Sequence, residues 1–184
     1  MGEADQLLKM AAEGDSEAFC RLIAVHEKWL FQRAYAMAHN FHLAEDLTQE
    51  TLLEAWKSIR RYDGTCRFTT WLYSILMHRY KKSRRHAGPA GLRPGLAAPA
   101  AEMDTLADPS AARALASVPL NEEAARVRAA IDQLPDAMRD VTSLRFFAHA
   151  TLDEIARILV IPEGTVKSRL HYALEKLREL AGSR

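Results

Sequence analysis

The sequence predicts an all-α protein of two small helical domains joined by a flexible linker, with a helix-turn-helix in the second domain. Apolar residues recur near the 3.6-residue spacing of amphipathic helices over most of 5–86 and again over 121–184, and no segment alternates as a β-strand would. Residues 87–120 instead collect proline, glycine and alanine without apolar periodicity, which is typical of a linker. We therefore predict domains over 1–86 and 121–184.

Four helices are expected in the first domain. A short helix around residues 7–12 ends at Gly14, and Asp15 caps the second helix. The second is predicted as one helix with the apolar set Phe19, Leu22, Ile23, Val25, Trp29, Leu30, Ala34 and Met37. The third follows a turn at Asn40 and carries Leu43, Leu47, Leu52, Leu53, Trp56 and Ile59. After a turn at 62–65, the fourth carries Trp71, Leu72, Ile75 and Leu76 and ends in the basic run 81–85.

The second domain is predicted to hold four more helices. Asn121 starts one that Pro135 closes, and another runs through 138–147. Thr151 and Glu154 form a capping box for a short helix to Leu159, and the last helix runs from Pro162 to about Leu180. The last two helices form the helix-turn-helix, with Ala156 at their close approach and Ile161 and Val166 packed between them.

Val160 is an irregularity in the predicted turn of the helix-turn-helix. This turn position usually requires a positive φ, which glycine adopts freely and a β-branched residue resists. The turn is therefore either built differently or strained at this residue.

Charge is unevenly distributed along the 184 residues, although 25 Lys and Arg against 24 Asp and Glu give a net charge of only +1. Residues 1–60 hold 6 basic and 10 acidic side chains, a net −4, whereas 61–86 hold 7 basic and 1 acidic, a net +6. This contrast between neighbouring segments is more informative than the sum.

Several classes of protein are disfavoured by the sequence. No apolar run approaches the roughly 18 residues that span a bilayer, and the first ten residues are acidic and amphipathic, unlike a signal peptide. Cys20 and Cys66 are far apart and form no CxxC pair, which indicates two reduced thiols and no disulfide framework or zinc knuckle. We expect a cytoplasmic protein.

The last helix is the first candidate binding element. It displays polar residues outward, as the recognition helix of a DNA-binding protein does when it reads base edges in the major groove. These residues are Glu163, Thr165, Lys167, Ser168, Arg169, His171 and Tyr172. A plain helical hairpin with a solvated face is the alternative, and the clustering of basic donors favours DNA.

The segment 60–86 is the second candidate, because basic groups track phosphates and aromatic faces stack on unpaired bases. Its candidate residues are Arg61, Tyr62, Arg67, Phe68, Arg79, Lys81, Lys82, Arg84 and Arg85. Trp71 is expected in the core, whereas Tyr62 and Phe68, beside the turn, are better placed to meet a base. The segment predicts binding to single-stranded or locally melted nucleic acid, and a solvated face is the alternative.

The third helix provides a row of a different character. Asp46, Gln49, Glu50 and Leu53 share one helical face, which suits a basic protein surface and not DNA. A solvated face explains the same row equally well on the residues alone.

Signs of catalysis are lacking in the sequence. It has no glycine-rich phosphate loop, nucleophile elbow or HExxH motif, and no carboxylate pair stands out. His39 and His42 have no nearby third ligand and are expected to be an ordinary surface pair. No enzyme activity, cofactor, metal site or small-molecule substrate is predicted.

Four stretches in order carry a resemblance to a known family: AEDLTQETLLEAWKSI at 44–59, RFTTWLYSIL at 67–76, LPDAMRDVTSLRFF at 134–147 and LDEIARILVIPEGTVKSRLHYALEKLREL at 152–180. Together they resemble bacterial RNA polymerase sigma factors of the extracytoplasmic-function group, which belong to the sigma-70 family. The resemblance covers both predicted domains and implies a promoter-specificity subunit with no catalytic activity of its own.

The family's properties imply roles for segments already described. The helix with Asp46, Gln49 and Glu50 would bind the clamp of the polymerase β′ subunit, and residues 61–85 would open the −10 element and capture a flipped base. The helix from Glu163 to Tyr172 would read the −35 element, and its domain would also dock on the β flap. The resemblance further implies an anti-sigma factor, often membrane-bound.

The linker resembles the connector that runs through the polymerase channel toward the active site. Its Glu102, Asp104 and Asp108 could mimic nucleic acid there.

Departures from the family pattern prevent any transfer of promoter preference. Val160 replaces the usual turn glycine, Tyr172 stands where many members have arginine, and His78 and Lys82 stand where Asn and Asp are common.

Two rival functions are a stand-alone helix-turn-helix regulator and a nucleic-acid-processing enzyme. A regulator of duplex DNA needs neither the acidic row nor the aromatic-basic segment. An enzyme needs a metal or nucleophile constellation that the sequence lacks.

Overall fold

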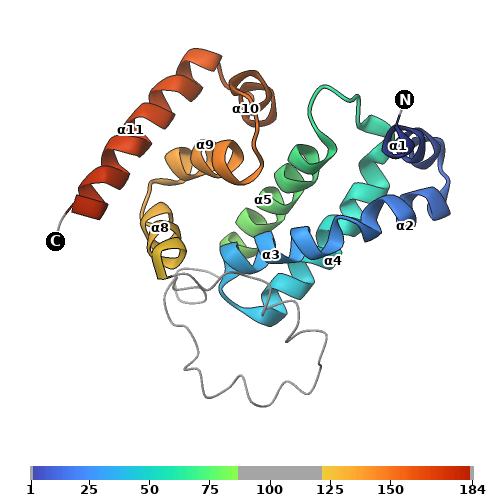
Figure 1. Ribbon diagram of the computed structural model, residues 1–184, viewed down its shortest axis with the longest axis horizontal. Helices are drawn as coiled ribbons and strands as arrows, with labels where there is room; N and C mark the ends of the chain where they lie inside the picture. Colours follow the sequence, from blue (N-terminus) through green and yellow to red (C-terminus); the bar gives the residue numbers. More distant parts are fainter. Residues whose placement is uncertain (1, 87–121, 183–184) are drawn as a thin grey trace. The chain divides into compact units, whose positions relative to one another are not determined.

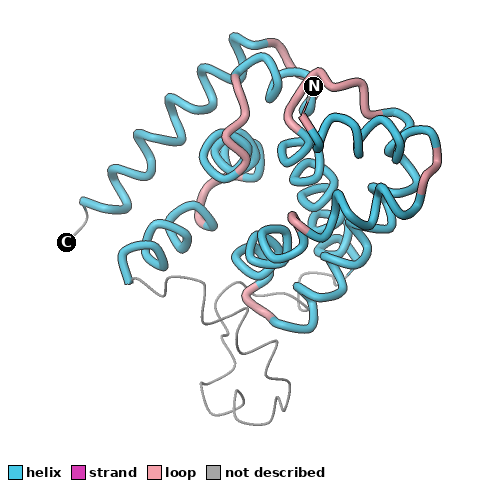
Figure 2. Tube along the Cα trace, turned by 45° about the vertical axis from the view of Figure 1, so that its right-hand side comes forward, coloured by secondary structure: helices cyan, strands magenta, loops and turns pink. Residues whose placement is uncertain are grey.

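The computed structural model describes residues 2–86 and 122–182, and all regular secondary structure in these ranges is helical, which confirms the predicted class (Figures 1 and 2). The helices of the first range are α1 (Glu3–Glu13), α2 (Ser16–Ala24), α3 (Glu27–Ala38), α4 (Phe41–Ser58), the short 3-10 helix η1 (Ile59–Arg61) and α5 (Phe68–His86). Those of the second are α8 (Glu122–Asp132), α9 (Asp136–Phe147), α10 (Leu152–Leu159) and α11 (Glu163–Gly182).

By their packing, the described residues form two units, one of residues 2–64 and 71–86 and the other of residues 65–70 and 122–182. The predicted linker 87–120 lies outside the described residues, so the predicted domain boundaries stay a prediction. None of the helices in the described ranges is both long and apolar enough to cross a membrane.

The junction between α1 and α2 is closed by local hydrogen bonds, as predicted. Gly14 adopts φ 104° at the end of α1, where its N–H donates to the Ala11 carbonyl and the Asp15 N–H donates to the Met10 carbonyl, each at 3.0 Å. The Asp15 carboxylate then accepts from the Glu17 N–H at 2.9 Å and so caps α2.

The prediction of one helix from Asp15 to Met37 was wrong, because the chain turns at Val25 and His26. The His26 N–H donates to the Ile23 carbonyl, three residues back, at 2.7 Å, whereas an α-helical N–H donates to the carbonyl four residues back. Helix α3 then begins at Glu27. The break lets α2 pack mainly on α1 while α3 packs along α4. Val25, which was predicted to belong to the apolar face of that single helix, is 75% exposed at this break.

His26 is half-buried at the same break. Burial disfavours the charged imidazole and so lowers the pKa of His26 from its usual value of 6.5.

Helix α4 begins as predicted, with the Asn40 side chain accepting from the Leu43 N–H at 2.9 Å. Its inner face is buried and consists of Ala44, Leu47, Thr48, Thr51 and Ala55. The Thr48 hydroxyl donates to the Ala44 carbonyl at 2.7 Å, and the Thr51 hydroxyl donates to the Leu47 carbonyl at 2.6 Å. The buried hydroxyls are therefore satisfied within the helix.

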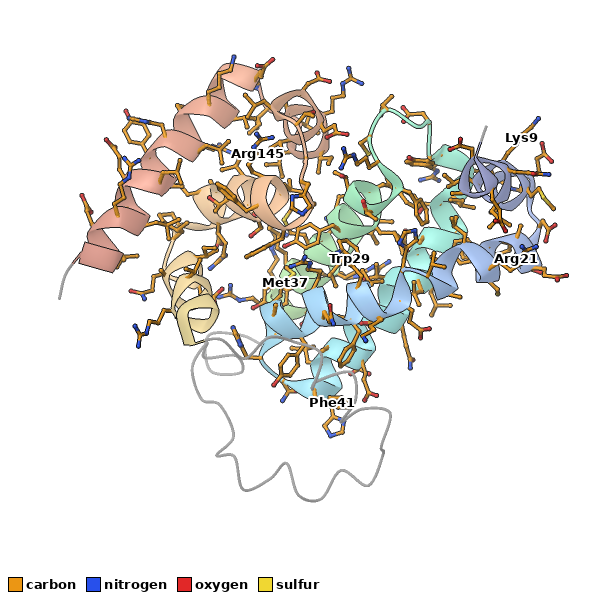
Figure 3. All side chains as sticks on the ribbon, viewed as in Figure 1. Lys9, Arg21, Trp29, Met37, Phe41 and Arg145 are labelled. Atoms are coloured by element: carbon orange, nitrogen blue, oxygen red, sulfur yellow. The ribbon has the colours of Figure 1, made fainter. Side chains whose placement is uncertain are left out.

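Helix α5 buries Leu72, Tyr73, Leu76 and Met77. The Tyr73 ring centroid lies 6.4 Å from that of Trp29 on α3, which Figure 3 labels. The apolar side of α5 is thus committed to the core of the first unit.

In the second unit, α10 begins with the predicted capping box. The Thr151 hydroxyl accepts from the Glu154 N–H at 3.2 Å, and the Glu154 carboxylate accepts from the Thr151 N–H at 2.6 Å. Ile155 is fully buried, as are Val166 and Ala173 on α11. The predicted helix-turn-helix is therefore present.

The turn between α10 and α11 has the positive φ that was expected to be difficult for valine. Val160 adopts φ 53° and ψ 51°, the left-handed region, and the Ile161 N–H donates to the Ala156 carbonyl at 3.0 Å. The Pro162 carbonyl accepts from the Thr165 N–H at 2.9 Å, and α11 begins at Glu163, one residue later than predicted. The turn keeps the glycine geometry, and Val160 is strained by it.

Replacing Val160 with glycine should therefore stabilise the protein. The side chain is 88% exposed, so little packing is lost, whereas the left-handed conformation costs an ordinary residue roughly 1–2 kcal/mol. We expect Val160→Gly to raise the free energy of unfolding by about 1 kcal/mol in urea titrations followed by circular dichroism.

Val25 offers the matched control, because it is also exposed but has a right-handed φ of −78°. Val25→Gly should lower the stability, since glycine only adds freedom to the unfolded chain there. Equal destabilisation by both substitutions would contradict the strain at Val160.

Candidate functional site

The row predicted on the third helix lies together on the outer face of α4. Asp46, Gln49 and Glu50 are exposed, and Leu53 continues the row with 60% of its surface exposed. We call these four residues the acidic row. It lies opposite the buried face of α4, so the packing of the helix alone orients it toward solvent.

The acidic row differs from its charged neighbours in its partners. Glu45 lies 3.7 Å from the His42 imidazole, and Glu54 pairs with Arg79 of α5. Within the described residues, no hydrogen bond or ion pair engages the side chains of Asp46, Gln49 or Glu50. Two carboxylates and an amide beside an exposed leucine can receive a basic, partly apolar protein surface.

Only some of the basic side chains predicted between residues 61 and 85 are exposed to solvent. Arg61, Arg67, Lys82 and Arg85 are exposed, whereas Lys81 and Arg84 are half-buried. The Arg84 guanidinium lies 5.8 Å from the centroid of the Tyr80 ring, which orients it by a cation–π contact.

Two predicted DNA contacts are engaged inside the protein. The Arg79 guanidinium donates to the Glu54 carboxylate, and its side chain is 22% exposed, so its charge is already compensated. The Phe68 side chain is 8% exposed and presents no free ring face. The expectation that both are open to nucleic acid does not match their surroundings.

Tyr62 and Trp71 lie together beside the turn that precedes α5. Their ring centroids are 5.3 Å apart with an interplanar angle of 49°. Both rings are half-buried, so Tyr62 is held at the surface by Trp71 and keeps an exposed part.

One exposed row on α5 includes a residue that sequence reasoning left out of the site. His78, Lys82 and Arg85 are spaced i, i+4 and i+7 and are all exposed. The spacing relative to Lys82 and Arg85 was the signal that could have placed His78 in the same group.

Helix α11 presents its predicted residues to solvent to different degrees. Glu163, Lys167, Ser168, His171 and Tyr172 are exposed, and Thr165 and Arg169 are half-buried. The buried Val166 and Ala173 fix the opposite face of the helix against its own unit. This is how a recognition helix is held so that its outer face enters a major groove.

The exposed face of α11 carries its own ion pairs. The Lys167 ammonium lies 2.8 Å from the Glu163 carboxylate, and the His171 imidazole lies 3.5 Å from the Glu175 carboxylate. These i, i+4 pairs orient the long side chains, and a DNA phosphate or base would have to compete with the carboxylates.

Metal ligands are not assembled in the parts that the structure describes. No group of three or more His, Cys, Asp or Glu side chains there could hold an ion. Cys20 and Cys66 are free thiols, the first exposed and the second half-buried.

The helix-turn-helix with its exposed donors and the basic helix suit DNA, and the separate acidic row suits a protein surface. These features define a helical DNA-binding protein that also docks on another protein. Comparisons with known proteins identify which one. The Sigma-70 region 2 family matches residues 22–89, and the Sigma-70 region 4 family matches residues 130–179.

A curated relative extends this match over nearly the whole chain. The ECF RNA polymerase sigma factor SigW of Bacillus subtilis is 32% identical over an alignment of 184 positions that covers 94% of this chain and 93% of the relative. The chain therefore belongs to the extracytoplasmic-function group of the sigma-70 family of RNA polymerase sigma factors, and a stand-alone regulator is not favoured.

Solved structures agree on the fold. The structure of CnrH in complex with the cytosolic domain of CnrY has a TM-score of 0.67 and 22% identity, and it covers 99% of both chains. The sigma factor RpoE in complex with the anti-sigma factor NepR from Bartonella quintana has a TM-score of 0.61 and 20% identity, over 90% of this chain and 97% of that one.

The pairing of Arg79 leads to a prediction about its role. Arg79→Ala should lower the free energy of unfolding by up to about 1 kcal/mol, the range of a partly exposed ion pair, because Glu54 loses its partner. It should leave the salt dependence of binding to a single-stranded oligonucleotide unchanged. Urea unfolding and fluorescence anisotropy at several salt concentrations measure the two effects.

Arg85 is the matched control on the same helix, because it is exposed. Arg85→Ala should leave the stability nearly unchanged and reduce the salt slope by roughly 0.7, the value for one phosphate contact to a single strand. The reverse pattern for the two arginines would refute the assignment of Arg79 to the fold.

Proposed function

We propose that this sigma factor binds core RNA polymerase through the acidic row of α4 and reads a two-element promoter with two further surfaces. As a member of its family, the chain is a transcription initiation factor that directs core polymerase to promoters. The observation that carries this assignment is the separation of the surfaces, because the acidic row lies on α4 whereas the exposed row of His78, Lys82 and Arg85 lies on α5.

The acidic row is proposed to bind the clamp of the β′ subunit. Asp46, Gln49 and Glu50 project from one face, are not engaged within the described residues, and adjoin the exposed Leu53. A negative row of this kind repels DNA phosphates, so its binding partner is proposed to be a basic protein surface.

Opening of the −10 element is proposed for the segment 61–85. Arg61, Arg67, Lys82 and Arg85 would hold the phosphates of the separated strands, and Tyr62 would stack on an unpaired base. Phe68 would take part only after its ring becomes exposed. Arg79 would instead stabilise the first unit through its ion pair with Glu54 and would not contact DNA.

Reading of the −35 element is proposed for the exposed face of α11. Lys167 and Arg169 carry donors suited to guanine or phosphate, and the Glu163 carboxylate can accept a hydrogen bond from cytosine. The second unit is further proposed to dock on the β flap, and the protein to act in the cytoplasm with the polymerase.

An anti-sigma factor is proposed as the controlling partner. The structurally similar CnrH and RpoE were each solved with a bound partner, the cytosolic domain of CnrY and the anti-sigma factor NepR respectively. A partner that covers the acidic row would block polymerase, whether it is soluble or membrane-bound.

Transcription in vitro tests the function. Purified protein with core polymerase should start transcripts at specific promoters in a run-off assay, whereas the protein alone should bind duplex DNA weakly. Specific nanomolar binding to a duplex operator without polymerase would instead support the stand-alone regulator.

A single substitution tests the proposed binding of the acidic row to the β′ clamp. Asp46→Arg should abolish association with core polymerase, because it places a cation where the row receives a basic surface, and should leave the circular dichroism spectrum unchanged. Glu45→Arg, also exposed on α4 but outside the row, is the control and should keep most of the affinity. Equal affinity of wild type and Asp46→Arg for core would refute the assignment.

The −35 assignment predicts losses on the recognition helix. Lys167→Ala and Arg169→Ala should each weaken use of the cognate −35 element by roughly 1–3 kcal/mol, the cost of a lost base contact. Lys176→Ala, exposed on the same helix in its second half, is the control. Transcription from promoters with intact and scrambled −35 elements measures the effect, and indifference to both substitutions would rule out this face of α11.

A further inference from the structure

Residues 65–70 lie within the stretch proposed to open the −10 element, yet they pack with the second unit. The chain on either side of them, up to Gly64 and from Trp71 onward in α5, packs with the first unit. The segment 65–70 contains Arg67 and Phe68, which the sequence placed among the DNA contacts. Its packing therefore bears directly on whether these two residues can meet a DNA strand.

Two hydrogen bonds hold segment 65–70 to the end of α9 and the start of α10. The Thr70 hydroxyl donates to the Ala148 carbonyl at 3.2 Å, and the Arg67 N–H donates to the Glu154 carboxylate at 3.3 Å. The Thr70 side chain is fully buried, and Phe68, two residues earlier, is buried as well. The start of α5 is thus a packed element of the second unit and not a free loop.

The connection between α9 and α10 is a fixed receptor for this segment. The Ala150 N–H donates to the Leu144 carbonyl at 3.0 Å, and the Arg145 guanidinium, labelled in Figure 3, donates to the Ala150 carbonyl at 2.8 Å. Ala148 and Ala150 are themselves buried. The carbonyl that receives Thr70 therefore belongs to a turn that is already set by its own contacts.

Glu154 accepts one of its hydrogen bonds on each carboxylate oxygen. Its Oε2 atom accepts from the Thr151 N–H in the capping box, and its Oε1 atom accepts from the Arg67 N–H. Arg67 directly precedes α5, and negative charge beside the first turn of a helix is favourable. A DNA phosphate is favoured at a helix N-terminus for the same reason. The Glu154 carboxylate and a phosphate of the opened strand would therefore compete for the same end of α5.

We propose that this packing is an autoinhibitory contact, in which the end of α9 and the start of α10 mask part of the segment that opens the −10 element. The Phe68 ring and the Arg67 N–H cannot meet an unpaired strand while they are engaged in the second unit. Segment 65–70 must therefore leave Ala148 and Glu154 before the promoter is opened. This inference rests on the proposed role of residues 61–85 and adds a step that regulates it.

Two substitutions loosen the contact without altering a proposed DNA contact. Thr70→Val nearly keeps the shape of the side chain but removes its donor. Glu154→Gln keeps the capping box, because glutamine also serves there, but leaves one oxygen for two N–H groups. The matched controls are Thr142→Val, which removes a buried hydroxyl that donates within α9, and Asp153→Asn, which neutralises a carboxylate in the same first turn of α10.

The readout is the affinity of the free full-length protein for a labelled single strand that carries the non-template −10 sequence of a promoter found in the run-off assay. Each loosening variant should bind roughly fivefold more tightly than wild type, the shift that one lost hydrogen bond gives to the masked state. Both controls should stay within twofold of wild type, as should binding of every variant to a −35 duplex. Hydrogen exchange in peptides that contain residues 66–70 should be faster in the two loosening variants only.

The outcomes separate the inference from the function on which it rests. Faster exchange without tighter binding would show that the contact masks nothing, and unchanged exchange would show that it does not hold the segment, so either result overturns the inference. Equal tightening by Asp153→Asn would assign the effect to lost negative charge and overturn it as well. Failure of the wild-type protein to open a promoter with core polymerase would instead overturn the proposed function. If Thr70→Val does not fold, Glu154→Gln decides alone by the same criteria.

Discussion

The buried face of α4 is the constraint on which the first unit depends. Small and hydroxyl-bearing residues line it, and Thr48 and Thr51 satisfy their hydroxyls on carbonyls of the same helix. Helix α3 can therefore lie closely along α4 without leaving either threonine hydroxyl unpaired. Because a helix repeats every 3.6 residues, this choice of inner face decides that Asp46, Gln49 and Glu50 face outward. The docking surface follows from the packing.

Two left-handed residues show how the same backbone geometry can serve different ends. At Gly14 the residue without a Cβ adopts φ 104° and ends α1, and the flexible end of the Arg60 side chain lies close by. At Val160 the same region of φ is occupied by a β-branched residue that is largely exposed, and no such close approach is involved. The protein tolerates strain at the turn of the helix-turn-helix, where the surrounding bonds to Ala156 and Pro162 hold the geometry.

The elements that sequence reasoning predicted well are those set by neighbouring residues. The caps at Gly14, Asp15 and Thr151 depend on atoms within a few positions, and all three are present. The turn predicted at Asn40 is present too, and its side chain caps α4. The break between α2 and α3 was missed because residues 19–37 keep a helical apolar period through it. What turns the chain at Val25 and His26 is the different packing partner of each helix, and spacing along one segment does not reveal this.

The candidate site was predictable to a similar degree. Exposure of the acidic row and of the polar face of α11 follows from helical periodicity, and both agree with the predicted faces. The burial of Phe68 and the ion pair of Arg79 do not follow from it. Glu54 and Arg79 are 25 residues apart in the sequence, so only the tertiary fold brings them together.

The ion pair between Glu54 and Arg79 also bears on the contrast in charge between residues 1–60 and 61–86. It removes one negative charge from the segment with a net −4 and one positive charge from the segment with a net +6, because the two charges compensate each other inside the unit. The exposed charges outside this pair include the acidic row on α4 and Arg61, Arg67, Lys82 and Arg85. Because the pair joins α4 to α5 with only one charge from each segment, each segment keeps the sign of charge that its proposed partner requires.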